Sequence, residues 1–154
     1  MLTPEEIHEI NEEILMYPYK QAACIEALKV VQKHRRWVSD ENIEDIAEIL
    51  EMSAAEVDSV ATFYNLIYRK PVGKNVILLC DSVSCYIMGY EFVRSAIELK
   101  LGISMGETTP DDQFTLISVP CLGACDHAPA MMVGPNLYHD LTQEKIVQIL
   151  DSYL

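Results

Sequence analysis

Four of the five cysteines in this chain occur in two pairs, and each pair follows a short run of aliphatic and β-branched residues. Cys80 and Cys85 form the stretch CDSVSC after NVILL, and Cys121 and Cys125 form CLGAC after FTLISVP. Such runs, bounded by turn residues, predict buried strands. Because ligands collect at the carboxyl ends of strands in open α/β sheets, we expect the two loops to face each other around one site.

A four-thiolate site of this kind suits zinc or an iron–sulfur cluster. The spacings are C-x4-C and C-x3-C, which are longer than the C-x2-C hooks typical of structural zinc sites. Longer spacings favour a 2Fe–2S cluster, in which each pair holds one iron, and leave structural zinc as an alternative. Thiol–disulfide chemistry usually requires C-x-x-C, so it is a third and less favoured interpretation.

Composition narrows the class of protein further. A chain of 154 residues with 50% hydrophobic content can bury a substantial core. Its net charge of -13 argues against nucleic acids and anionic membrane surfaces as partners, since both reward clustered Lys and Arg. The densest basic stretch, KHRRW at 33–37, is predicted to be the favourable cationic end of a helix.

The sequence also bears on where the protein resides. No apolar stretch approaches the roughly 18 to 20 residues of a membrane span, so no direct membrane insertion is expected. The N-terminal stretch MLTPEEIHEI is acidic and has neither a secretory apolar region nor the character of a transit peptide. We therefore expect a cytoplasmic protein, whose reducing surroundings do not keep structural disulfides.

Residues 1–72 have the apolar periodicity of helices and are predicted to form a helical bundle domain. Thr3 and Glu6 predict a capping box that begins the first helix. A second apolar face follows from Ala23 to Val31, and Asp40 or Asn42 is the expected cap of a third helix that reaches Leu50. A fourth helix is expected to begin at the capping box SAAE, residues 53–56.

Residues 73–154 have a different pattern and are predicted to form an α/β domain. Two strands are expected at 75–80 and 114–119, a third around 131–133, and helices at 89–100 and 142–153. The order strand, helix, strand, strand, helix predicts a sheet covered by helices. The expected fold class is thus a helical bundle followed by an α/β domain.

Several strings resemble a known family. CDSVSCYIMGYE, the CLGAC region and the upstream segments EALKVVQKHRRWVSDENIEDIA and VDSVATFYNLIYRKPVGKNVI resemble the E subunit of bacterial NADH-quinone oxidoreductase, respiratory complex I. The resemblance covers nearly the whole chain. It implies that the α/β domain is a thioredoxin-like 2Fe–2S ferredoxin, and that the ligands of one 2Fe–2S cluster are Cys80, Cys85, Cys121 and Cys125.

The same resemblance implies a role in electron transfer. The cluster would exchange electrons with FMN in a flavoprotein subunit that binds FMN and NADH, and other peripheral-arm subunits would be further partners. The arm would lie on the cytoplasmic face of the inner membrane. No independent catalysis is expected from this chain alone, and related subunits of NAD-linked hydrogenases and formate dehydrogenases are the alternative parents.

Other residues have simpler interpretations. Cys24 lies on a helical apolar face and is expected to be a small buried hydrophobic residue rather than a ligand. His127 neighbours Cys125, but four cysteines make a histidine ligand unnecessary, and His139 has no partner motif. The adjacent Phe63 and Tyr64 are expected to pack in the core, with contact to a partner as the alternative.

Two aspartates, Asp81 and Asp126, each follow a cysteine of the predicted site. Reduction makes an all-thiolate 2Fe–2S cluster more negative, so nearby negative charge disfavours it. One interpretation is that these carboxylates help to keep the reduction potential low, and the alternative is that both are solvated loop residues.

Overall fold

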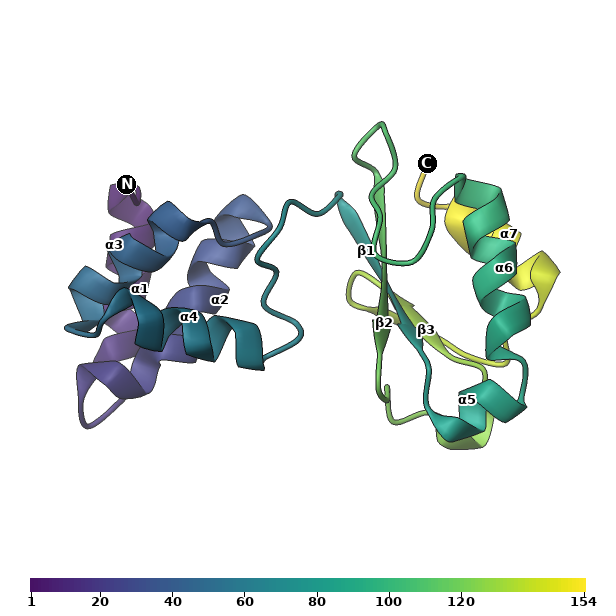
Figure 1. Ribbon diagram of the computed structural model, residues 1–154, viewed down its shortest axis with the longest axis horizontal. Coiled ribbons are helices and arrows are strands. Elements are labelled where there is room, and N and C mark those ends of the chain that lie inside the picture. The colour runs from purple at the N-terminus through teal and green to yellow at the C-terminus, as the bar shows by residue number, and fades with distance from the viewer. The chain divides into compact units, whose positions relative to one another are not determined.

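The computed structural model describes residues 1–154 and contains two compact units, Met1–Pro71 and Val72–Leu154 (Figure 1). The first unit is entirely helical: α1 (Pro4–Ile14), η1 (Lys20–Ala23), α2 (Cys24–Arg35), α3 (Asp40–Leu50) and α4 (Ala54–Phe63). The second unit contains both strands and helices: β1 (Asn75–Cys80), α5 (Val83–Ile87), α6 (Tyr90–Leu101), β2 (Phe114–Val119), η2 (Cys125–His127), β3 (Met131–Val133), β4 (Asn136–Tyr138) and α7 (Gln143–Asp151). The predicted helical half followed by an α/β half is confirmed.

Capping boxes begin two of the helices where the sequence predicts them. The Thr3 side chain accepts the backbone N–H of Glu6, and the Glu6 carboxylate accepts the N–H of Thr3 in return. Ser53 and Glu56 make the same reciprocal pair at the start of α4. Each pair satisfies N–H groups that would otherwise lack partners at the start of a helix, and so fixes where the helix begins.

The prediction for the cap of α3 is wrong by a residue or more. Ser39, and neither Asp40 nor Asn42, is the N-cap. Its hydroxyl accepts the N–H of Asn42, and the Asn42 side chain bonds back to the N–H of Ser39. An Asn at the third helical position can complete a capping box, which makes Ser39 the better cap.

The helical unit has its own apolar core. Residues from α1, α2, α3 and α4 are fully buried in it, including Ile10, Leu28, Ile46 and Val57. Cys24, at the start of α2, lies in the same core and is 4% exposed. Burial raises the pKa of its thiol, so the expectation that Cys24 is a small buried hydrophobic residue is confirmed.

One ion pair joins α1 and α2. The Arg35 guanidinium donates to both carboxylate oxygens of Glu6, at 2.6 and 2.7 Å, and Glu6 is 1% exposed. The hydrogen bond from Arg35 is the main reason that the pKa of Glu6 falls to about 2. Arg35 is the last residue of α2, so the prediction that the basic stretch at 33–37 ends a helix is confirmed.

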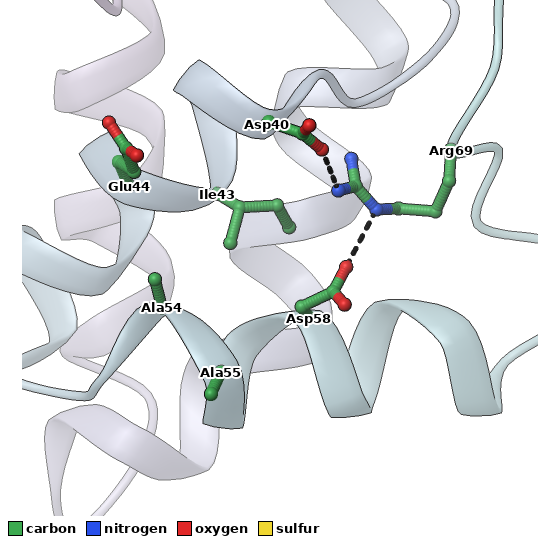
Figure 2. A pocket seen from close by; sticks show the side chains of 7 residues that line it. All are labelled: Asp40, Ile43, Glu44, Ala54, Ala55, Asp58 and Arg69. Carbon is green, nitrogen blue, oxygen red and sulfur yellow. Dashed lines mark hydrogen bonds and ion pairs between the residues drawn. The ribbon is translucent and has the colours of Figure 1, made fainter.

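A second arginine joins α3 and α4. Figure 2 shows Arg69 reaching between Asp40 of α3 and Asp58 of α4, and its nitrogens lie 2.6 and 2.9 Å from their carboxylates. Arg69 also donates to the carbonyl of Val38. The pocket beside it, about 330 Å³ in volume, therefore contains a guanidinium whose charge is already balanced by two carboxylates.

Two aromatic side chains of this unit are not where the sequence predicts them. Phe63 and Tyr64 are 79% and 47% exposed and contact each other edge to face, with ring centroids 5.1 Å apart. The prediction that they pack in the core is wrong. Phe63 lies two residues after the buried Ala61, which turns it toward the opposite face of α4, and Tyr64 follows the end of the helix.

The second unit is built on a four-stranded sheet with the order β2-β1-β3-β4. β1 and β2 are parallel, and the β1–β3 and β3–β4 pairs are antiparallel. Figure 1 shows α6 and α7 side by side along the sheet, and their apolar residues share one core with it, including Ile77, Leu116, Val93 and Ile146. The predicted strands and long helices are confirmed, whereas α5 and β4 were not predicted. Five residues of helix are too few to show a period, and β4 lacks the apolar run that marks the equally short β3.

Gly73 marks the close approach of the chain to β2 at the start of this unit. A Cβ atom at residue 73 would lie 2.9 Å from backbone atoms of Phe114. The N–H of Gly73 donates to the buried hydroxyl of Thr115 at 2.7 Å. A side chain here would push the segment that enters β1 away from β2.

None of the helices combines the length and the apolar character that crossing a lipid bilayer requires.

Candidate metal centre

The parallel pairing of β1 and β2 brings the two cysteine loops to one edge of the sheet. Cys80 is the last residue of β1 and lies in register with Val119, the last residue of β2. The loop after β1 leads to Cys85 in α5, and the loop after β2 carries Cys121 and leads to Cys125 in η2. Parallel strands end at the same edge, so the predicted convergence of the two loops is confirmed.

Cys80 and Cys85 form the buried side of the site. They are 2% and 1% exposed and pack with Ala128 and Ala130 in a small apolar cluster. Burial, together with a hydrogen bond to the Cys80 thiol, raises the pKa of Cys85 to about 11, and a hydrogen bond from the Ala130 backbone opposes this change. Without a bound cation the Cys85 sulfur is therefore held as a neutral thiol.

Cys121 and Cys125 form the exposed side. Their Sγ atoms lie 3.8 Å apart, and the N–H of Gly123 donates to the Cys121 sulfur at 3.3 Å. Gly123 has a φ of 77°, which glycine adopts without the strain that a Cβ atom would cause. This conformation lets the CLGAC loop turn its backbone N–H toward a sulfur atom.

Further contacts join the two pairs into one group. The Ser84 side chain, in α5, hydrogen-bonds to Cys125. The pKa of Cys125 is raised mainly by its hydrogen bond with Cys121, and a negative charge on Cys80 would raise it further. The pKa of Cys85 is raised in turn by the proximity of Cys125 as well as of Cys80. The four sulfurs therefore form one group, drawn from two loops.

The donor set fits a metal centre with thiolate ligands. Two thiolates bound to one tetrahedral metal ion at about 2.3 Å would lie about 3.8 Å apart, which agrees with the 3.8 Å between the sulfurs of Cys121 and Cys125. A disulfide would need about 2.05 Å, and all five cysteines are free. Sulfur ligands without oxygen select zinc or iron–sulfur clusters over hard cations.

Two histidines near the site have partners that the sequence did not indicate. His127 and His139 both contact the carboxylate of Asp140, and they lie outside the sulfur group. Asp140 was not singled out from the sequence, because only the fold brings residue 127 beside residues 139 and 140. Ser84 was missed for a similar reason, since its contact with Cys125 is made across two loops.

The two aspartates that follow ligand candidates are both on the surface. Asp81 is exposed, and the Asp126 side chain is 80% exposed, with an oxygen 3.6 Å from Nε2 of His127. Water therefore screens both charges. Fold and site together define a helical unit joined to an α/β unit, which has a candidate sulfur-lined metal centre where β1 and β2 end.

Comparisons with known proteins identify the family. The model of the thioredoxin-like [2Fe-2S] ferredoxin family matches residues 10–154. This chain belongs to that family, and its cofactor is one 2Fe–2S cluster.

Curated relatives match along almost the whole chain. The E subunit of NADH-quinone oxidoreductase from Buchnera aphidicola is 51% identical over 99% of this chain and 94% of its own length. The E subunits of the same enzyme from Pseudomonas aeruginosa and Escherichia coli K12 are 45% and 47% identical, over 100% and 99% of this chain and 93% and 92% of their own lengths. These relatives are subunits of an oxidoreductase complex, so the resemblance found in the sequence is confirmed.

A solved structure shows the same fold. The NAD+-reducing [NiFe]-hydrogenase in its air-oxidized state superposes with a TM-score of 0.73 over 85% of this chain and 22% of the hydrogenase chain, at 18% identity. At that identity the similarity concerns the fold alone.

Proposed function

We propose that this chain is an electron-transfer subunit of an NADH-quinone oxidoreductase, and that its 2Fe–2S cluster is ligated by Cys80, Cys85, Cys121 and Cys125. The observation that carries this assignment is the meeting of two thiols from one loop and two from another at one sheet edge. The names of the curated relatives support the parent enzyme. One pair of cysteines would hold each iron.

A bound 2Fe–2S cluster supplies a carrier of single electrons. The residues of the chain would hold the cluster and set its reduction potential. The buried Cys80 and Cys85 exclude water from one side, and the N–H of Gly123 stabilises negative charge on the Cys121 sulfur. Hydrogen bonds to cluster sulfurs raise the potential, whereas exposed carboxylates lower it.

The electron-exchange partner in this proposal is the flavoprotein subunit that binds FMN and NADH. The chain itself has no G-x-G-x-x-G motif and no basic cluster in its second unit that could hold a pyrophosphate. Nucleotide binding is therefore assigned to the partner alone. Other subunits of the peripheral arm, on the cytoplasmic face of the membrane, would complete the assembly.

Two exposed apolar groups support docking to such a partner. Around the exposed sulfurs, α5 and the residue after it present Val83, Tyr86, Ile87 and Met88, which are between 60% and 75% exposed. The hydrogen bond from Ser84 to Cys125 ties this helix to the sulfur group. Exposed apolar surface next to a redox centre suits a permanent subunit interface.

The helical unit is the other docking element that we propose. Phe63, Tyr64 and Leu66 expose 79%, 47% and 48% of their surface at and after the end of α4. A few residues near the centre of an interface, often aromatic ones, contribute most of the binding energy. A partner covering these residues would remove them from water.

A second candidate parent is an NAD-linked hydrogenase or formate dehydrogenase, in which an equivalent diaphorase subunit would perform the same electron transfer. The hydrogenase with the same fold favours this candidate. A structural zinc module and a thiol oxidoreductase remain as contrasting functions. The raised pKa values of Cys85 and Cys125 disfavour the thiol oxidoreductase, because redox-active cysteines depend on lowered ones.

The experiment that tests the cluster assignment is EPR spectroscopy of the anaerobically purified, dithionite-reduced protein, with iron and sulfide measured on the same sample. We expect a rhombic or axial signal near a g value of about 2 and about two irons per chain. An EPR-silent protein with stoichiometric zinc would instead indicate a scaffold and overturn the proposal.

A second measurement tests the partner. NADH added to the isolated chain should leave the cluster oxidised. NADH added together with the flavoprotein subunit should reduce the cluster and bleach the visible absorbance of the cluster. Bleaching by NADH without that subunit would contradict the assignment of nucleotide binding to the partner.

A further inference from the structure

Three side chains next to the sulfur group converge on one point. Nδ1 of His127 lies 3.1 Å from Oδ2 of Asp140, and Nδ1 of His139 lies 2.7 Å from the same oxygen. The two imidazole rings have centroids 4.7 Å apart. One ligand atom from each of the three residues lies within 4.8 Å of the others. Both histidines thus present the same ring nitrogen to a single carboxylate oxygen.

Backbone contacts hold this convergence in place. The N–H of Asp140 donates to the carbonyl of His127 at 2.8 Å, which joins the segment after β4 to the end of η2. Asp140 has a φ of 50°, a conformation that Asp tolerates better than most residues. Lys145 donates to the backbone carbonyl of Asp140, so the carboxylate stays available to the two histidines. The three ligand atoms are therefore brought together by the backbone as well as by mobile side chains.

The chemistry of these three groups matches that of a divalent metal site. Two imidazole nitrogens and one carboxylate oxygen are common ligands of zinc, and a water molecule completes a tetrahedral site. Ligand atoms about 2.0 to 2.1 Å from a tetrahedral ion lie about 3.3 Å from one another. To admit the ion, the separations of 3.1 and 2.7 Å from Oδ2 would widen to about 3.3 Å.

A neighbouring carboxylate adds a feature frequent in zinc sites. Nε2 of His127 lies 3.6 Å from Oδ2 of Asp126. A metal-binding histidine usually donates its other ring N–H to a carboxylate, which orients the ring and makes it a better ligand. With a metal on Nδ1, His127 would point Nε2–H at Asp126. The net charge of -13 further favours a cation at this surface.

We propose that His127, His139 and Asp140 form a second metal site that binds a divalent ion such as Zn²⁺, separate from the four-cysteine centre. All three side chains are about half exposed, so the ion can enter directly from solvent. Binding at Nδ1 leaves each neutral imidazole with its proton on Nε2, and it requires no movement of the cysteine loops. This site does not depend on the identity of the parent enzyme.

The test is a calorimetric titration of Zn²⁺ into the oxidised, cluster-loaded protein, with the visible absorbance of the cluster recorded before and after. We expect uptake of one ion by the site without loss of the cluster absorbance. The variants His139→Ala and Asp140→Asn should each weaken this binding by about tenfold or more. Asn is the conservative choice at residue 140, because it also tolerates a positive φ.

The matched control is His8→Ala, since His8 is an exposed histidine of α1 that lies 3.5 Å from the single carboxylate of Glu12. This variant should bind Zn²⁺ as the unmodified protein does. The proposal is overturned if the protein takes up no Zn²⁺, or if His139→Ala and His8→Ala have the same affinity as the unmodified protein. Equal weakening by His8→Ala and His139→Ala would also overturn it, because it would indicate unspecific surface binding.

Discussion

Cys80 and Val119 are paired across parallel strands, each as the last residue of its strand. This pairing places the exits of two loops side by side, so that cysteines about 40 residues apart in the sequence can surround one centre. The buried pair, Cys80 and Cys85, closes the inner side of the centre, and the exposed pair, Cys121 and Cys125, leaves the outer side open to a partner.

The first prediction concerns the cysteines themselves. Cys85→Ser and Cys125→Ser should each reduce iron from about two atoms per chain to nearly none, because a 2Fe–2S cluster needs all four ligands. Iron content and visible absorbance of the purified variants measure this loss. Cys24→Ala is the matched control and should keep the cluster, since Cys24 lies in the core of the helical unit. A variant that keeps a full cluster would remove that cysteine from the ligand set.

Changing the charge of Asp126 should alter the reduction potential. Asp126→Asn removes a negative charge one residue from Cys125 and should raise the midpoint potential, because reduction adds negative charge to the cluster. The side chain is 80% exposed, so the interaction is worth at most about 1 kcal/mol, or about 40 mV for one electron. A redox titration followed by EPR measures the shift, and an unchanged midpoint would contradict the expectation.

A side chain at residue 73 should destabilise the second unit. Gly73→Ala would bring a Cβ atom to 2.9 Å from the backbone of Phe114, and we expect a loss of about 1 to 3 kcal/mol in the free energy of unfolding. Urea denaturation followed by the visible absorbance of the cluster reports on this unit. Lys74→Ala, at the exposed neighbouring residue, should leave the midpoint of the transition nearly unchanged. A similar shift in both variants would argue against the steric explanation.

The ion pair between Glu6 and Arg35 should contribute to stability above the acid range. Since the pKa of Glu6 falls from 4.5 to about 2 on folding, the contribution is fully present above about pH 4.5 and is lost as the pH falls toward 2. Glu6→Gln should cost about 2 to 3 kcal/mol at pH 7. Gln can still complete the capping box with Thr3. The variant therefore removes the negative charge of residue 6 and keeps the cap of the helix.

Far-UV circular dichroism during urea denaturation at pH 7 measures this effect in the helical unit. Glu44→Gln, at an exposed residue of α3, is the control and should change stability by less than about 0.5 kcal/mol. If Glu6→Gln proves as stable as the unmodified protein, the prediction is wrong. The attraction between Glu6 and Arg35 would then only balance the free energy that their desolvation costs.

Local signals in the sequence determined much of this protein. The capping boxes at Thr3 and Ser53 and the aliphatic run before Cys80 depend on contacts within a few residues, so they can be read without a structure. The two cysteine pairs likewise indicated a metal centre, because their spacing and their place after strands are properties of the chain alone.

Only the tertiary structure decided which distant side chains meet. The hydrogen bond from Ser84 to Cys125 and the meeting of His127 with His139 and Asp140 join segments that no periodicity relates. Phe63 and Tyr64 are exposed because α4 buries the face that carries Val57 and Ala61, and which face is buried depends on packing against the other helices. Contacts of this kind arise from the packing of whole elements, because side chains remote in sequence become neighbours only when the sheet and its helices have formed.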